Sequence, residues 1–407
     1  MRYSIYDACF SESMQTGRGL SALYLVWELH RHGLTEYSIE QSDIILATVQ
    51  SPTSADFIRL LSQRHSNKII VCGGSASTSP YSIGLHCDVV CVGDGQNFLS
   101  VLFGGGGLEA AKRLPNAWID GETRRVEIDQ GFPWNMPPIQ SEDKAYRLWC
   151  GHGCKNKCKF CQTGWAYKYS ENPSPKTLIE QAEGLISHGK RIAYLSNDLA
   201  QHKFYSSLPP TQHGSYSVAF LKKVGLPPAR QIRLGIEGVS ERLRKSVSKP
   251  ISYSDLLDST IWLNNNHKSV RWFMISGLPT EIQDDWNELK QIIQEWKLKT
   301  TKGVLAVSFT AFLPEPATPF ATLPINDDYW PLYLDFKDWF FGGQGWSNRV
   351  KLMFPASPES RMKMAMLKMG LTELQLREGG HISPNARLIY PYENKIKKLS
   401  NHPAYPI

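Results

Sequence analysis

Apolar runs alternate with amphipathic stretches over the first hundred residues. The apolar, β-branched runs occupy 2–8, 43–51, 68–74 and 88–94. Stretches with helical periodicity follow them at 19–33, 54–64 and 96–103. Short strands separated by amphipathic helices are typical of a parallel sheet that helices cover on both faces. The pattern predicts an α/β fold that begins with a doubly wound parallel sheet over residues 1–110.

The alternation resumes after Trp149. Helical stretches are expected at 175–189, 217–225, 254–266 and 284–297, and strands at 191–197, 231–237, 270–277 and 304–312. Repeated strand and helix units predict a second parallel sheet, curved into part of a barrel, over residues 141–325. Residues 111–140 are rich in Gly, Pro and Asn and are interpreted as a linker. Residues 326–407 are aromatic-rich and then helical, and predict a small capping region on the substrate side.

Composition supports a folded protein and limits its location. Of the 407 residues, 42% are hydrophobic and 20% are charged, which excludes global disorder and favours two or three domains. No apolar run approaches the roughly 20 residues that cross a bilayer. The N-terminal stretch is too short and too interrupted by polar residues for a signal peptide. We therefore expect a cytoplasmic protein without a membrane partner.

Two features would suit a nucleic-acid substrate. Residues 351–407 hold nine Lys and Arg against four Glu, and aromatic residues crowd 329–346. Basic charge attracts polyanions, and aromatic faces stack on bases. Both features have ordinary explanations as well, namely a solvated basic surface and aromatic core packing. The sequence leaves these explanations open.

The least accidental feature is a cysteine cluster. Four of the eight cysteines lie between Cys150 and Cys161, and Cys154, Cys158 and Cys161 share one short segment with C-x3-C-x2-C spacing. Three thiolates on one loop can each bind a different iron of a [4Fe–4S] cube, which leaves the fourth iron open for chemistry.

Alternative ligands and nearby charges also bear on this segment. Cys150 and His152 could complete a structural zinc site, which is the alternative. The neighbouring lysines are expected to lower the pKa of the thiols. These lysines are Lys155, Lys157 and Lys159.

The cysteine segment and several later motifs resemble the radical S-adenosylmethionine (SAM) superfamily. The cysteine motif continues as Cys161-Gln-Thr-Gly164. Matching segments lie at 233–244, 273–281 and 312–320, and residues 45–100 resemble the cobalamin-binding-type, Rossmann-like domain that precedes the barrel in one branch. The resemblance covers about 45–325 and implies a partial (β/α)6 radical SAM barrel. It also implies a cluster that cleaves SAM to a 5′-deoxyadenosyl radical, reduced by a donor such as flavodoxin or ferredoxin.

The resemblance also implies which residues hold SAM. The polar strand end at 196–198 would contact the methionyl amino group, and Glu237 would orient the ribose or carboxylate. Arg242 or Arg244 would neutralise the SAM carboxylate, although first-turn arginines are as often surface charges. Gly277 would form the turn beside the adenine. The strand-end residues are Ser196, Asn197 and Asp198.

Glycines mark the strand ends of the N-terminal domain. Ligands of doubly wound sheets lie beyond the carboxyl ends of the strands, where glycine permits close backbone approach. These glycines are Gly73, Gly74, Gly93 and Gly95. The motif D-x-H-x-x-G, whose histidine coordinates cobalt in many cobalamin proteins, is absent from the sequence. Cobalamin binding and a remnant domain that helps to bind substrate both remain open.

Three functions are compatible with the sequence. The first is a radical SAM enzyme that rearranges or modifies a bulky substrate, with a nucleic-acid base as one hypothesis. The second is a cobalamin-dependent radical SAM methyltransferase. The third is a metal-organised nucleic-acid-binding module without catalysis. The substrate, the residue that quenches the product radical and the oligomeric state do not follow from the sequence.

Overall fold

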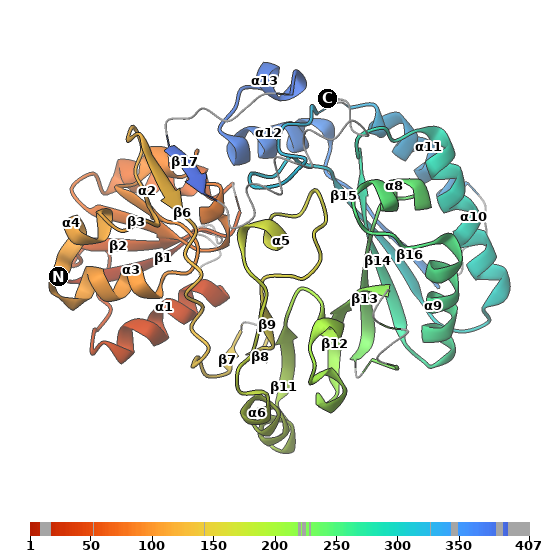
Figure 1. Cartoon of the computed structure of the whole chain (residues 1–407), viewed down its shortest axis with the longest axis horizontal. Helices are drawn as coiled ribbons and strands as arrows, with labels where there is room; N and C mark the ends of the chain where they lie inside the picture. Colours follow the sequence, from red (N-terminus) through yellow and green to blue (C-terminus); the bar gives the residue numbers. More distant parts are fainter. Residues whose placement is uncertain are drawn as a thin grey trace.

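Two α/β units lie side by side in the protein, and the cysteine segment runs between them (Figure 1). The structure is a computed structural model. It describes residues 1–8, 18–51, 53–141, 143–218, 221, 225–227, 229–325, 327–342, 349–379 and 386–389. Within these ranges, no helix has both the length and the apolar character that a membrane crossing requires.

The N-terminal unit is a five-stranded sheet with the order β1-β2-β3-β4-β5. Strands β1 to β4 are parallel and β5 is antiparallel to β4. The strands are β1 (Tyr3–Asp7), β2 (Ile44–Thr48), β3 (Ile69–Gly73), β4 (Val89–Cys91) and β5 (Ala117–Trp118), and the helices are α1 (Leu20–Arg31), α2 (Ser54–Arg64), α3 (Gln96–Val101) and α4 (Gly107–Lys112). The predicted doubly wound sheet is confirmed.

Burial on both faces explains why these strands read as continuous apolar runs. Ile44 and Leu46 of β2 join the core that includes α1, whereas Ile45 and Ala47 join the core that includes α2. Both faces of the sheet are therefore covered by helices, as a parallel sheet requires.

The second unit is built on a parallel sheet with the order β12-β13-β14-β15-β16. A smaller sheet, β11-β8-β7, continues it, and Thr211 Oγ1 of β12 donates to Ile192 O of β11 at 2.8 Å. The strands are β7 (Ile139–Gln140), β8 (Ala145–Trp149), β11 (Arg191–Leu195), β12 (Thr211–Tyr216), β13 (Ala229–Glu237), β14 (Ser269–Ser276), β15 (Leu305–Ala311) and β16 (Val350–Met353), and the helices are α6 (Pro175–Ser187), α8 (Glu241–Ser246), α9 (Tyr253–Asn265) and α10 (Gln283–Lys299). The predicted partial barrel is confirmed.

Three barrel strands differ from the expectations. Strands β8 and β12 carry polar residues among their apolar ones and were not predicted. Strand β16 lies beyond the expected barrel boundary at residue 325, and pairs with β15 in parallel. The expected linker contributes strands to both units, because β5 joins the N-terminal sheet and β7 joins the barrel. The expected helix at 217–225 lies largely outside the described residues.

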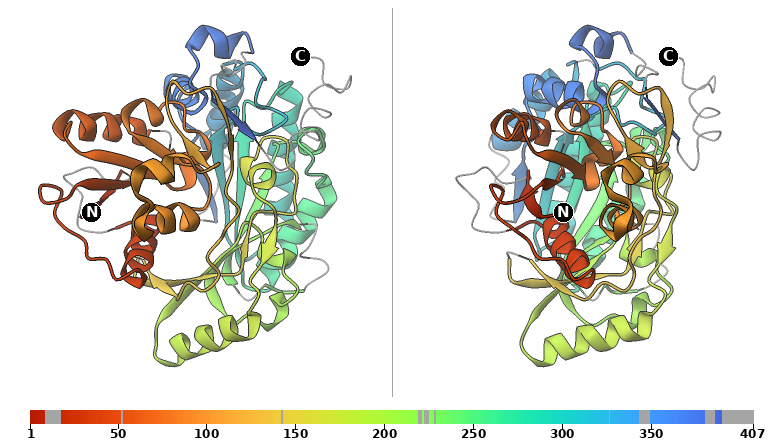
Figure 2. Two further views of the ribbon diagram at one scale, coloured as in Figure 1. Left: turned by 60° about the vertical axis from the view of Figure 1, so that its left-hand side comes forward. Right: turned by 90° about the vertical axis from the view of Figure 1, so that its left-hand side faces the viewer.

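The C-terminal segment returns to the N-terminal unit (Figure 2). Its helices are α11 (Tyr329–Phe341), α12 (Pro358–Met369) and α13 (Glu373–Arg377). Strand β17 (Ala386–Ile389) pairs in parallel with β6 (Arg124–Glu127). Helix α12 also reaches the first unit, where Leu367 packs against its core and Lys363 pairs with Asp56 at 3.3 Å. The described C-terminal residues therefore hold the two units together.

The aromatic stretch of 329–346 is largely core. Tyr329, Tyr333, Phe336 and Phe340 of α11 are buried. The rings of Tyr333 and Phe336 contact Trp286 of α10 and Phe309 of β15. Trp346 lies outside the described residues. Packing accounts for the buried aromatics of this stretch, so they carry no argument for base stacking.

Candidate active site

The cysteine segment follows the first barrel strand. After β8 the chain forms β9 (Gly151–His152), which pairs with β10 (Ser170–Glu171), and helix α5 (Gln162–Ala166) begins directly after the third cysteine. Two glycines allow the close turns of this segment. A Cβ at Gly153 would lie 2.6 Å from Lys168 O, and a Cβ at Gly164 would lie 2.3 Å from Asn156 O. The loop is therefore pressed against its own backbone on both sides of the cysteines.

Contacts inside the barrel fix the cysteine segment. The Trp165 indole is fully buried and donates to Cys158 O at 2.8 Å. Lys159 N donates to Val247 O at 3.1 Å, which ties the segment to the end of α8. Asn197 Nδ2 donates to Gly153 O at 2.9 Å, which ties it to the end of β11. The positions of the cysteines are thus set by the strand ends of the barrel.

Burial dominates the chemistry of the three thiols. It raises the pKa of Cys154, Cys158 and Cys161, and that of Cys158 reaches about 12. The lysine that lowers the pKa of Cys154 and Cys158 is Lys249, far along the chain. The pKa of all three thiols is therefore raised by burial, where the sequence predicts a net lowering by neighbouring lysines.

The flanking lysines have other partners. Lys155 Nζ donates to Gln201 O at 2.7 Å and lies over the Tyr169 ring. Lys157 Nζ donates to Gly164 O. Both ammonium groups thus bind backbone carbonyls. They brace the cysteine loop mechanically.

The three thiols of the cysteine segment lie near one another in the fold. Cys154 and Cys161 both act electrostatically on Cys158, so the three thiols are neighbours. In the part of the chain that the structure describes, no three His, Cys, Asp or Glu side chains converge closely enough to hold one ion. Thiolates that each bind a different iron do not need to converge on one point.

The residues of the zinc alternative point elsewhere. Cys150 is buried in the barrel core. The His152 ring stacks on Phe132 with the ring centroids 4.5 Å apart. Neither side chain therefore joins the other cysteines in the four-ligand site that a structural zinc ion would require.

A cavity of about 170 Å³ lies inside the barrel at its carboxyl end. Asn156 of the cysteine loop lines it beside the predicted residues Asn197, Asp198 and Glu237. Glu237 has a positive φ of 72° and its carboxylate pairs with Lys249 Nζ at 2.9 Å. The structure thus brings these predicted SAM contacts together.

Asp198 is almost fully buried beside this cavity. Its Oδ1 accepts from Ser217 N at 3.1 Å and from Ala200 N at 3.2 Å, and its Oδ2 accepts from Gln201 Nε2 at 3.1 Å. Burial nevertheless raises the pKa of Asp198. The hydrogen bonds fix the orientation of this carboxyl group, so it acts as a rigid part of the cavity wall.

Three predicted SAM residues lie outside both cavities. The Arg242 guanidinium binds Asp285 and donates to Thr280 O at 2.7 Å. Arg244 is buried and binds Glu288 at 3.1 Å. Both arginines therefore join α8 to the start of α10. Gly277 has a φ of 75° and donates its N–H to Glu281 at 3.0 Å in the turn after β14.

A larger cavity of about 550 Å³ lies between the two units. The predicted glycines Gly73, Gly74, Gly93 and Gly95 line its N-terminal side, together with residues of α1. The barrel side consists of the start of the cysteine loop and the end of β11, including Gly153, Ser196 and Asn197. The glycines thus line one cavity with the cysteine loop, as their strand-end positions predict.

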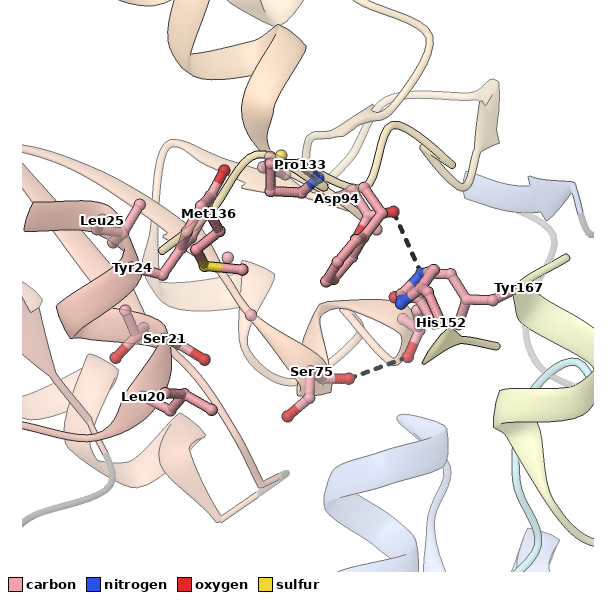
Figure 3. A pocket seen from close by; sticks show the side chains of 18 of the residues that line it. Leu20, Ser21, Tyr24, Leu25, Ser75, Asp94, Pro133, Met136, His152 and Tyr167 are labelled. Atoms are coloured by element: carbon pink, nitrogen blue, oxygen red, sulfur yellow. Dashed lines mark hydrogen bonds and ion pairs between the residues drawn. The ribbon is translucent and has the colours of Figure 1, made fainter. Parts of the chain in front are cut away.

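A few polar side chains lie in the wall of this cavity, among them Tyr24, Asp94 and His152 (Figure 3). Tyr24 OH is buried and has no hydrogen-bond partner among the described residues, whereas Asp94 Oδ2 and His152 Nε2 face each other. His152 Nε2 stands 3.3 Å from Asp94 Oδ2, so the two units face each other across this pair. The remaining wall is largely apolar, with Leu25, Met136 and others. A mostly apolar wall with a few polar groups is typical of a cofactor pocket.

Sequence reasoning missed several of these residues. Lys249 belongs to no recognisable sequence motif, because the turn after α8 brings its side chain to the cavity. Tyr24 occupies an ordinary position on an amphipathic helix. His152 was considered only as a zinc ligand, whereas its side chain faces the large cavity. The available signal for His152 was its position as a polar residue next to the cysteine motif.

Comparisons with known proteins find similar folds at low identity. TsrM, a radical SAM methyltransferase from Kitasatospora setae solved with cobalamin and a [4Fe–4S] cluster, has a TM-score of 0.56 at 11% identity over 80% of each chain. OxsB, a cobalamin-dependent SAM radical enzyme solved with aqua-cobalamin and SAM, has a TM-score of 0.54 at 14% identity, over 91% of this chain and 62% of its own.

Sequence comparison alone is less informative. No family model matches the chain. The uncharacterized protein MJ0966 of Methanocaldococcus jannaschii is 22% identical over 214 residues. The match covers 48% of this chain and 47% of that protein, so the chain spans about half the length of the curated relative that it matches. The resemblance noted in the cysteine and strand-end motifs is thus confirmed at the level of the whole fold: the chain has the two-unit fold of the cobalamin-dependent radical SAM enzymes.

Proposed function

We propose that this protein is a radical SAM enzyme that holds cobalamin between its two units. One observation carries the proposal: the cysteine loop separates two cavities. Gly153 lines the large cavity, Asn156 lines the small one, and Asn197 lines both. A cluster on this loop would face SAM on one side and a second cofactor on the other.

The residues of the small cavity suit SAM. Cys154, Cys158 and Cys161 would hold the cluster, and Asn156 and the polar end of β11 would stand beside its open iron. With SAM bound, a reduced cluster supplies a 5′-deoxyadenosyl radical. The chain's own task is to orient SAM and to exclude water. Lys249 offers a cation and Glu237 an anion for the charged methionyl end, and their mutual pairing holds both side chains in place.

The large cavity suits cobalamin. Its wall is mostly apolar, as the faces of a corrin ring require, and its few polar groups, the unpartnered Tyr24 OH and the Asp94–His152 pair, can bind the amides of the corrin rim. The glycine turns bring backbone close to the ligand without side chains in between. Cobalamin, when bound, supplies a carrier for methyl groups.

The reaction type follows from the products. The purified protein is reconstituted without oxygen with iron, sulfide and hydroxocobalamin, and then reduced in the presence of SAM. We expect a bound corrin absorption spectrum after gel filtration and formation of 5′-deoxyadenosine. S-adenosylhomocysteine beside it would indicate methyl transfer, and 5′-deoxyadenosine alone would indicate rearrangement. A protein that retains no corrin and cleaves no SAM would contradict the proposal.

An electron donor completes the scheme. A cluster of this type has to be reduced before SAM is cleaved, so we propose a small redox protein such as flavodoxin or ferredoxin as the partner. Reduced flavodoxin should replace dithionite in the assay and support SAM cleavage. Cleavage with dithionite but never with either protein would contradict this partner.

A further inference from the structure

One row of residues crosses the interior of the barrel sheet with an excess of positive charge. The strand register places Ser215 opposite Arg233, Arg233 opposite Arg271, Arg271 opposite Ala306, and Ala306 opposite Lys351. Residues in register on parallel strands project to the same face of the sheet. The row therefore contains three basic residues and no acidic one.

The alternation of the strands identifies this face as the barrel interior. The neighbours of Arg271, Val270 and Trp272, are buried in the core between sheet and helices. Arg271 and Phe273 therefore point the other way, and Phe273 lines the 170 Å³ cavity. Arg233 lines the same cavity. The arginine pair thus faces the space in which SAM is proposed to bind.

The two arginines have unsatisfied donors. Arg233 Nε and Arg271 Nε are buried and have no hydrogen-bond partner among the described residues. Burial lowers the pKa of Arg233, and Arg271 and Arg147 lower it further. Arg147 is tied to Asp143 at 2.6 Å. In the described part of the chain, no acidic side chain pairs with Arg233 or Arg271.

Adjacent guanidinium groups in this arrangement favour the binding of an anion. Both side chains are partly buried, and holding two like charges side by side without a counter-ion is unfavourable. Guanidinium forks bind carboxylate and phosphate oxygens with two parallel hydrogen bonds. Adjacent strands lie about 4.8 Å apart, so both arginines can reach the same oxyanion. We infer that Arg233 and Arg271, with Lys351 at the edge of the row, bind an oxyanion group of the substrate, a carboxylate or a phosphate.

This inference rests on the proposed function and limits the shape of the substrate. Arg233 precedes Glu237 by four residues on β13, but a bulge before Glu237 makes this three steps of the sheet register, which is about 10 Å along the strand. The anionic group would then bind deep in the barrel, while the reacting carbon lies near SAM at the carboxyl end. The substrate class is an elongated molecule that carries its anion roughly 10 Å from the reacting carbon.

Calorimetric titration of the purified full chain tests the site directly. Inorganic phosphate and succinate are the two probes, and the tighter one indicates whether the substrate carries phosphate or carboxylate. The double variant Arg233→Gln, Arg271→Gln should weaken binding of the tighter probe about tenfold or more, because charged hydrogen bonds are lost. The affinity of Arg271→Lys for the probe should lie between those of the wild type and the double variant, because lysine keeps the charge but lacks the forked guanidinium group. Arg230→Gln is the matched control at an exposed position near the start of β13 and should bind as the wild type does.

The outcomes separate this inference from the proposed function. Binding of neither probe, or equal weakening by Arg230→Gln, would overturn the inference. Phosphate or succinate should also bind the reconstituted protein equally well with and without saturating SAM. Mutual exclusion would mean that the arginines hold the SAM carboxylate, which overturns the substrate site. If SAM is never cleaved but the probes bind as expected, the proposed function fails and the anion site stands.

Discussion

Buried charged residues stabilise the turns around the barrel mouth. Glu281 is an example, because its carboxyl group accepts from Gly277 N, Leu278 N and Trp286 Nε1. Burial still raises its pKa to about 7. A native pKa above the unfolded value of about 4.5 means that the native state binds a proton more tightly. The contribution of Glu281 to stability is therefore complete below about pH 4.5 and is lost as the pH rises toward 7.

Glu281→Gln tests this assignment. As the pH rises from 4.5 to 7, the unfolding free energy of the wild type should fall relative to that of the variant by on the order of 3 kcal/mol. Glutamine keeps an acceptor for the turn but does not titrate. Urea titrations at a series of pH values give the difference. Glu180→Gln on the exposed face of α6 is the control. A difference independent of pH would contradict the raised pKa.

At the scale of elements, the turn after β3 depends on one glycine. Gly74 has a φ of 117°, and a Cβ at this position would lie 2.6 Å from Val49 O. Gly95 also lines the large cavity, but its φ is −97° and its nearest neighbour would be Cys91 Sγ at 3.7 Å. Gly74 is therefore required by the backbone, whereas Gly95 tolerates a methyl group.

The two glycines make a matched pair of variants. Gly74→Ala should lower the free energy of unfolding by about 1–3 kcal/mol, because it adds backbone strain and a clash. Gly95→Ala should change it by less than about 1 kcal/mol. Chemical denaturation of both variants provides the comparison. Equal stability of the two variants would mean that the turn has another conformation.

The sequence predicted some elements well for a physical reason. Strands β2, β3 and β14 are buried on at least one face, and their sequences are apolar runs. Strand β12 (TQHGSY) pairs through its backbone with β13 but carries few apolar side chains. Strand β16 is short, has exposed residues and lies at the sheet edge. Long-range pairing determines such strands, and hydrophobic periodicity does not reveal it.

At the scale of the molecule, the cysteines were predictable and the cavities were not. Cys154, Cys158 and Cys161 share one local motif, so their closeness in the fold could be predicted from their spacing. The large cavity combines α1, the ends of β3 and β4, the cysteine loop and β11. Residues such as Tyr24 and His152 meet there only after both units have folded. Arg242 and Arg244 show the converse. Their positions resemble those of SAM-binding residues in the family, but their side chains pair with acidic residues of α10 and join α8 to that helix.

The large cavity yields a prediction for the whole molecule. Asp94→Ala should weaken cobalamin binding about tenfold or more, because it removes a buried charged acceptor from the wall between the units. Equilibrium dialysis followed by absorption of the bound corrin gives the affinity without any need for activity. Asp120→Asn, at an exposed position, is the control. Unchanged affinity in Asp94→Ala would place cobalamin elsewhere.

The central claim is that three thiols hold a cluster that reduces SAM. Electron paramagnetic resonance of the anaerobically reconstituted, reduced protein, with iron analysis of the same sample, tests it most directly. We expect about four irons per chain and a [4Fe–4S] signal that SAM perturbs. Cys158→Ala should lose the signal, whereas Cys87→Ala, in the N-terminal unit, should keep it. A wild-type protein without a cubane signal, or a Cys158→Ala variant that retains it, would contradict the account.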